Sequence, residues 1–138
     1  MSDQLFEEPP IVATDTIRIL IVDDQLPFRT IARTVVGVTP GFSVSAEAES
    51  GEEAIALAAE VRPQLVLMDI NMPGINGVEA TRELLKIVPD AVVILASTYQ
   101  ADDLPVGADS CGAAAYVHKE DMSPALITSL WEEHRPTP

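Results

Sequence analysis

A run of four apolar residues that ends at one aspartate, Leu65–Asp69, constrains the fold of this chain more than any other feature. Four consecutive apolar residues fit a strand that is buried on both faces. Residues 71–77 contain Pro, Gly and Asn and therefore predict a sharp turn after that strand. Asp69 is expected at the carboxyl end of a central strand. In a parallel sheet covered by helices, this is the edge where ligands bind.

Segments typical of strands and helices alternate along the rest of the chain. Strands are predicted at 17–22, 42–48, 65–68, 92–96 and 114–118, with helices near 27–39, 54–61, 76–88, 102–111 and 124–133. Ser50, Asn76 and Ser123 have the residue types that begin helices. Five alternating strands and helices predict an α/β fold with a doubly wound parallel sheet. The helix between Asp102 and Cys111 is expected to be short or frayed, because it contains Pro105 and Gly107.

The 138 residues suffice for one domain. We expect an N-terminal arm at 1–16, a folded domain at 17–133 and a C-terminal tail at 134–138. The net charge of −14 argues against binding to nucleic acid or to anionic membranes, because both would repel the chain. No apolar run approaches the roughly 18–20 residues that span a bilayer, so direct membrane insertion is not expected. The single cysteine suits a reducing compartment, and a cytoplasmic location is expected.

Polar side chains that are far apart in sequence follow the predicted strands at the same edge of the sheet. They are Asp23, Asp24, Asp69, Ser97 and Lys119. Three carboxylates brought together would repel one another unless a cation offset their charge. Mg²⁺ suits such oxygen ligands in a partly open site. The ion, the lysine and the serine could contact a phosphoryl group, and a carboxylate, best Asp69, could act as its nucleophile.

The chain resembles the receiver domains of two-component response regulators, in particular those of regulators with helix-turn-helix output domains. The resemblance spans about residues 17–133 and is carried by Asp23-Asp24, by the segment 69–77, by Ser97 and by the segment 116–119. It implies a flavodoxin-like sheet with strand order 2-1-3-4-5. It also implies a signalling protein and no enzyme beyond its own Mg²⁺-dependent phosphorylation and dephosphorylation.

The resemblance also assigns roles to individual residues. Asp69 would accept a phosphoryl group from a histidine kinase or phosphotransfer protein. Asp23, Asp24 and Asp69, with the main-chain carbonyl of Asn71, would hold Mg²⁺. Ser97 and Lys119 would contact the phosphoryl group. Ser97 and Tyr116 would form the switch that reports phosphorylation.

Two features depart from the family pattern. Glu120 follows Lys119 where many receivers have proline, and the weak fourth helix belongs to the surface by which receivers signal. Only 19 residues follow Lys119, so we expect a stand-alone receiver that signals by protein–protein contact.

An alternative is an accessory subunit of a larger assembly, held through residues 1–16 and the C-terminal helix, in which phosphorylation is vestigial. A small Mg²⁺-dependent phosphatase is less favoured. Asn71 stands where such an enzyme needs an acid–base aspartate, and there is no cap domain to bind substrate.

Overall fold

The computed structural model describes residues 16–98 and 104–137. The expected N-terminal arm, except for Thr16, and the start of the expected fourth helix at Asp102 lie outside the described residues. Within the described part, no helix has the length and apolar character required to cross a membrane.

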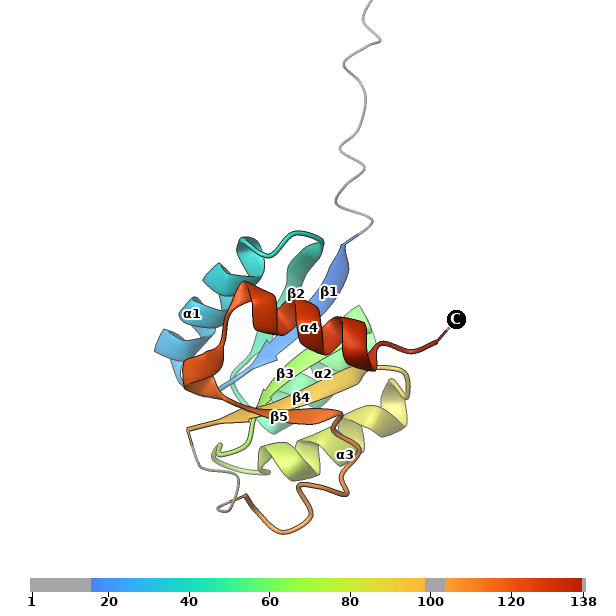
Figure 1. The fold of residues 1–138 in the computed structure, drawn as a ribbon. Coiled ribbons are helices and arrows are strands. Elements are labelled where there is room, and N and C mark those ends of the chain that lie inside the picture. The colour runs from blue at the N-terminus through green and yellow to red at the C-terminus, as the bar shows by residue number, and fades with distance from the viewer. Residues whose placement is uncertain (1–15, 99–103, 138) are drawn as a thin grey trace, which may run out of the picture.

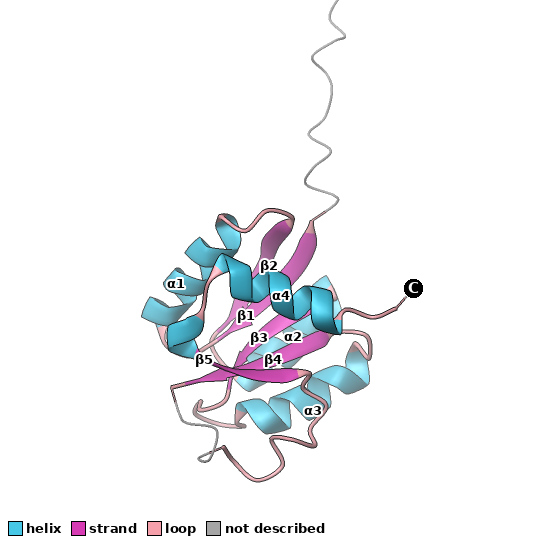
Figure 2. Ribbon diagram, in the orientation of Figure 1, coloured by secondary structure: helices cyan, strands magenta, loops and turns pink. Residues whose placement is uncertain are grey.

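The centre of the fold is one parallel sheet with strand order β2-β1-β3-β4-β5 (Figures 1 and 2). Its strands are β1 (Ile17–Val22), β2 (Phe42–Ala48), β3 (Leu65–Asp69), β4 (Val92–Ser97) and β5 (Ala115–His118). The predicted sheet and its strand order are confirmed. Asp69 is the last residue of the central strand, as its sequence context predicted.

Helices cover both faces of the sheet. They are α1 (Leu26–Gly37), α2 (Gly51–Val61), α3 (Gly77–Ile87) and α4 (Pro124–His134), with a 3₁₀ helix, η4 (Lys119–Asp121), after β5. Helices α1 and α4 lie on one face, and α2 and α3 lie on the other (Figure 1).

The core has two halves because successive side chains of a strand point to opposite faces. In β1, Ile19 and Ile21 pack with α1 and α4, whereas Leu20 and Val22 pack with α2 and α3. All four side chains are at most 1% exposed. Because both faces are covered, the inner strands read as continuous apolar runs instead of alternating ones.

Three helices begin where the sequence predicted. The side-chain oxygens of Ser50, Asn76 and Ser123 accept hydrogen bonds from the main-chain N–H groups of Glu53, Glu79 and Leu126, at 3.1, 2.9 and 3.1 Å. Each bond satisfies an N–H group that has no partner within its helix, and such caps contribute about 1 kcal/mol. The caps fix where α2, α3 and α4 start relative to the preceding strands.

The helix expected between Asp102 and Cys111 is reduced further than its sequence suggested. In the described part of that segment, residues 106–110 form turns and the flanking residues 104–105 and 111–112 are not helical. Gly107 has φ +90°, which a right-handed helix does not allow, and Pro105 lacks the N–H that a helix interior needs. The described chain therefore has four α-helices and one 3₁₀ helix instead of five helices, and α4 is the C-terminal one.

Gly77 lets α3 start directly against the end of β3. Its N–H donates to the Ile70 carbonyl oxygen at 2.8 Å. A Cβ atom at this position would lie 2.1 Å from the Asp69 carbonyl oxygen, which is far inside contact distance. The absence of a side chain here keeps the end of β3, and with it Asp69, in place.

We predict that Gly77→Ala lowers the free energy of unfolding by roughly 1–3 kcal/mol or more, because the methyl group overlaps main-chain atoms that cannot move independently. The control is Gly37→Ala at the end of α1, where a Cβ meets no atom within 4 Å. Alanine there favours the helix by up to about 1 kcal/mol. Urea unfolding of the two variants measures the difference, and equal stabilities would contradict this account.

Candidate functional site

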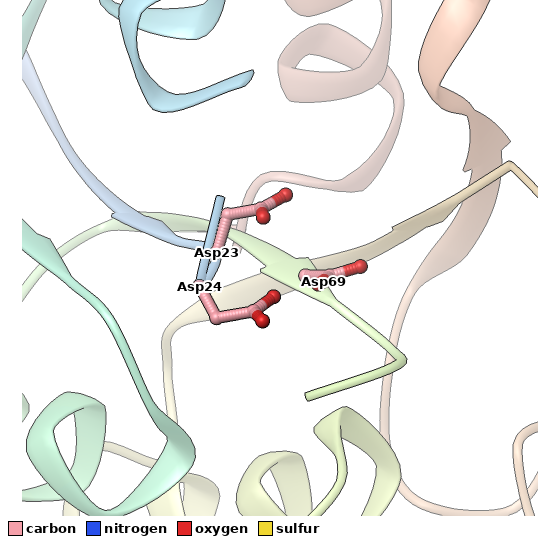
Figure 3. Close-up of side chains that lie close together, drawn as sticks. All are labelled: Asp23, Asp24 and Asp69. Atoms are coloured by element: carbon pink, nitrogen blue, oxygen red, sulfur yellow. The ribbon is translucent and has the colours of Figure 1, made fainter. Parts of the chain in front are cut away.

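Three carboxylates meet at the carboxyl edge of the sheet, as predicted. Asp23 and Asp24 directly follow β1, and Asp69 ends the neighbouring strand β3, with Val22 and Met68 as partners in the register. Each of the three offers an oxygen that lies within 4.8 Å of the others. Figure 3 shows the three side chains projecting from the strand ends into the same space.

Lys119 joins two of these carboxylates. Its Nζ atom lies 2.6 Å from Asp23 Oδ2 and 3.2 Å from Asp69 Oδ1. The ammonium group also lies 4.7 Å from the centre of the Phe28 ring, at a distance typical of a cation–π contact. Because Lys119 begins η4 directly after β5, the lysine reaches the site from the edge strand. Strands β1, β3 and β5 thus all contribute to it.

Asp23 is fully buried and held by neighbours on both its side chain and its main chain. Its Oδ1 accepts a hydrogen bond from the Gln25 N–H at 2.8 Å, and its carbonyl oxygen accepts one from Arg29 Nη1 at 2.8 Å. Asp23 Oδ2 makes no hydrogen bond of acceptable geometry within the described residues, although the Lys119 ammonium lies close to it. One buried carboxylate oxygen is therefore left with an ion pair alone.

Arg29 supports Asp23 and was missed by the sequence analysis. It is 8% exposed, and its guanidinium lies 3.4 Å from Glu47. The signal that could have found it is its position in α1, where it shares the buried stripe with Ala32 and Val36. A charged residue in an apolar stripe needs partners, and here they are Glu47 and the Asp23 main chain.

The Asp69 carboxyl is 4% exposed, and its surroundings raise its pKa from 3.8 to about 6. Burial is the main cause, and the nearby Asp23 charge adds to it. The Lys119 ammonium and a hydrogen bond from the Asn71 main chain partly oppose the rise in pKa. Asp69 is thus a carboxylate whose negative charge is poorly compensated in the folded protein.

Lys119 responds to the same surroundings in the opposite sense. Burial lowers its pKa, but contact with Asp23 and Asp69 outweighs burial, so the pKa lies above its ordinary value. The lysine therefore remains an ammonium at neutral pH. It offsets part of the negative charge of the three carboxylates and leaves the rest for a cation.

The residues present fit Mg²⁺. A depression of about 510 Å³ opens over the carboxylates and is lined by Asp24, Gln25, Asp69, Asn71, Met72, Pro73, Ser97, Thr98 and Lys119. The atoms that could coordinate a metal here are oxygens, which Mg²⁺ prefers as ligands. The depression is open, so it has room for the water molecules that Mg²⁺ keeps. Asp23 Oδ2 already lies 2.6 Å from the Lys119 ammonium, so Asp24 and Asp69 are the carboxylates that line this depression.

Ser97 and Tyr116 lie in different places. Ser97 ends β4, is 2% exposed and lines the depression over the carboxylates. Tyr116, in β5, is half-buried and lines a separate depression of about 290 Å³ with Leu95, Leu104 and neighbouring alanines. The structure therefore brings Ser97 to the acidic site and does not bring Tyr116 there.

His118 links the ends of β4 and β5, a role that the sequence did not reveal. Its Nε2 lies 2.9 Å from the Thr98 carbonyl oxygen, and its Nδ1 accepts a hydrogen bond from the Glu120 N–H at 3.3 Å. The acceptor role of Nδ1 places the ring hydrogen on Nε2, which can then donate to Thr98. The imidazole thus links the main chain just after Ser97 to the end of β5, directly before Lys119.

We predict that Asp69→Asn stabilises the metal-free protein at pH 7–8, and that this gain falls as the pH drops toward 4. A raised folded-state pKa means that ionising Asp69 costs stability; the cost is absent below about pH 4 and fully present above about pH 6. The change in the gain is up to roughly 3 kcal/mol.

Urea unfolding of both proteins in EDTA at several pH values tests this prediction. Adding Mg²⁺ is the matched control, because ligand binding should stabilise the wild type more than the variant. A gain in stability that does not depend on pH would contradict the conclusion that ionisation of Asp69 destabilises the folded protein.

Comparisons with known proteins agree with this architecture. Residues 19–130 match the family model of the response regulator receiver domain. The chain is 43% identical over 103 residues to the response regulator GacA of Pseudomonas protegens, an alignment that covers 75% of this chain and 48% of GacA. It is 33% identical over 113 residues to the chemotaxis protein CheY of Thermotoga maritima, covering 82% and 93% of the two chains.

The fold has close counterparts among solved structures. The response regulator domain of Thermotoga maritima CheB superposes with a TM-score of 0.78 at 28% identity, covering 89% of this chain and 99% of that domain. The chain spans about half the length of GacA and of DegU from Brevibacillus brevis. Receiver domains are signalling domains rather than ordinary enzymes, and the comparisons do not favour an accessory subunit. The chain belongs to the response regulator receiver domain family.

Proposed function

We propose that this receiver domain, residues 17–133, accepts a phosphoryl group on Asp69 from a phosphohistidine of a histidine kinase or phosphotransfer protein. The observation that carries the proposal is the Asp69 carboxylate in an open depression, with the Lys119 ammonium 3.2 Å from its Oδ1. Membership of the receiver family supports the same chemistry.

The transfer forms one bond and breaks one bond. An Asp69 carboxylate oxygen attacks phosphorus, the P–N bond to the donor imidazole breaks, and the imidazole leaves with the bonding electrons and takes up a proton. The product is an acyl phosphate on Asp69. Lys119 offsets negative charge on Asp69 before the transfer and on a phosphoryl oxygen after it. Ser97, at the end of β4, is close enough to the depression to donate its hydroxyl to another phosphoryl oxygen.

Asp23, Asp24, Asp69 and the main chain of Asn71 would hold Mg²⁺. When bound, this ion offsets charge on the phosphoryl oxygens and orients them for in-line attack. The three carboxylates have oxygens within 4.8 Å of one another, which supports this assignment. Asp23 also contacts the Lys119 ammonium at 2.6 Å, so the lysine would offset part of its charge beside the ion.

Phosphorylation is proposed to shift the protein between two conformations through Ser97 and Tyr116. A phosphoryl group on Asp69 that binds the Ser97 hydroxyl would draw the end of β4 toward Asp69. The small depression beside Tyr116, between β4 and the turns at 104–114, offers its ring room to move. Such a shift requires the phosphorylated state to bind one conformation better than the other. The changed surface would then be recognised by an output protein.

We expect acetyl phosphate with Mg²⁺ to add one phosphoryl group to the wild-type protein and none to Asp69→Asn. Asparagine has nearly the same shape but lacks the nucleophilic carboxylate. Intact-protein mass spectrometry at several times measures the product. Glu60→Gln, which changes an exposed carboxylate in α2 away from both the acidic site and Tyr116, is the matched control and should be phosphorylated like the wild type. Full phosphorylation of Asp69→Asn would refute the assignment.

We expect Lys119→Gln to slow phosphorylation by acetyl phosphate roughly tenfold or more, because the ammonium that offsets developing charge is removed. Lys86→Gln is the control, since Lys86 pairs with the neighbouring Glu83 on the exposed side of α3, away from the acidic site. Rates are measured with Mg²⁺ at saturation, so that a change in metal affinity does not mask the effect. Equal rates for the two variants would remove Lys119 from the mechanism.

A further inference from the structure

A second depression lies at the end of the sheet opposite the carboxylates. It has a volume of about 520 Å³ and is lined by Arg18, Arg62, Pro63, Gln64, Val88, Asp90, Trp131, Arg135 and Pro136. These residues lie near the start of β1, before β3 and β4, and at the ends of α2, α3 and α4. In Figure 1 the end of α4 and the connection from α3 to β4 lie at the same end of the sheet, although α4 and α3 cover opposite faces.

The depression gathers positive charge in a strongly acidic chain. The sequence has only eight lysines and arginines against 22 acidic residues, and three arginines line this one depression. The other five basic residues each lie within 4.0 Å of an Asp or Glu oxygen. No described carboxylate lies within that distance of the Arg18, Arg62 or Arg135 side chains. Asp90 is the single acidic residue in the lining, so two positive charges remain uncompensated there.

Arg62 occupies an unusual backbone conformation beside this space. Its φ of +44° and ψ of 68° make it the only described residue other than glycine with positive φ. This left-handed conformation costs roughly 1–2 kcal/mol in a residue with a side chain. Pro63 contributes to it by disfavouring the right-handed helical conformation at the preceding residue. The strain is concentrated at a residue that lines the depression.

The arginines could also serve the helix ends alone. Arg62 and Arg135 are the residues at which α2 and α4 end, where carbonyl groups carry partial negative charge. Arg18 Nη2 does donate to the Arg62 carbonyl oxygen at 2.7 Å. Among the described residues, the exposed guanidinium groups of Arg62 and Arg135 make no hydrogen bond or ion pair. These two arginines retain donors for a ligand.

We propose that this depression binds a phosphorylated small molecule. Planar guanidinium groups match the oxygens of phosphate with paired hydrogen bonds, and two uncompensated positive charges match a phosphate dianion. Pro63, Val88 and Trp131 supply an apolar floor for the part of the molecule that bears the phosphate. The volume falls in the range of about 300–1,000 Å³ that is typical of small-molecule sites. An extended acidic peptide would need a longer groove.

Trp131 gives the experiment a direct reporter, because it is the only tryptophan in the chain and lines the depression. Its fluorescence is titrated with pyrophosphate, with ADP and with adenosine, in EDTA so that no metal links the anion to the carboxylates. We expect a saturable change with ADP and pyrophosphate and none with adenosine. Saturation by ADP with no response to pyrophosphate would also support a phosphorylated molecule that needs its apolar part.

Two matched variants decide whether the arginines bind the ligand. Arg62→Gln/Arg135→Gln should raise the Kd for ADP at least tenfold, whereas Arg33→Gln/Arg82→Gln, which removes two ion-paired arginines elsewhere, should leave it unchanged. If Arg62→Gln/Arg135→Gln lowers the melting temperature without changing the Kd for ADP, the proposal is overturned. The two arginines then only stabilise the ends of α2 and α4. Tighter binding of a hexaglutamate peptide than of ADP would overturn it in favour of an acidic protein partner. The absence of any saturable signal would also overturn it.

Discussion

The contact of the Lys119 ammonium with Asp23 and Asp69 is the interaction on which the acidic site depends. Two buried carboxylates side by side are unfavourable, and a third, Asp24, lies within 4.8 Å. The Lys119 ammonium, which reaches the site from the edge strand, offsets part of this repulsion. Burial lowers the pKa of Lys119, but its contacts with the carboxylates raise it by more, so the lysine stays protonated. It offsets only part of the negative charge, because the pKa of Asp69 is still raised to about 6. The site therefore keeps an excess of negative charge in the folded protein.

Most of the fold and the acidic site could be predicted from the sequence, because both follow from local rules. Buried strands read as apolar runs, and polar residues that follow such runs in a parallel sheet must meet at one edge. This rule alone placed four residues together, without any knowledge of side-chain contacts: Asp23, Asp69, Ser97 and Lys119. The helix starts were equally accessible, since each cap depends on residues only three positions apart.

The parts that could not be predicted depend on contacts between distant segments. Arg29 looked like an ordinary helix residue until its bonds to the Asp23 main chain and Glu47 were visible. The contact of His118 with Thr98 could not be predicted, because the two residues lie 20 positions apart in the chain. The fourth helix was recognised as weak, but its replacement by turns also reflects the φ of +90° at Gly107. The grouping of arginines at the opposite end requires the start of β1 and the ends of α2 and α4 to converge, which no short motif encodes.

The bond between His118 and Thr98 has a mechanical consequence for the sheet edge. Parallel strands β4 and β5 are already joined along their length by main-chain bonds, and the imidazole adds a cross-brace beyond the last of their paired residues, Ser97 and His118. A brace at that point stiffens the rim against hinging between the two strands. We therefore expect the end of β4 and the edge strand β5 to move together when the end of β4 is displaced.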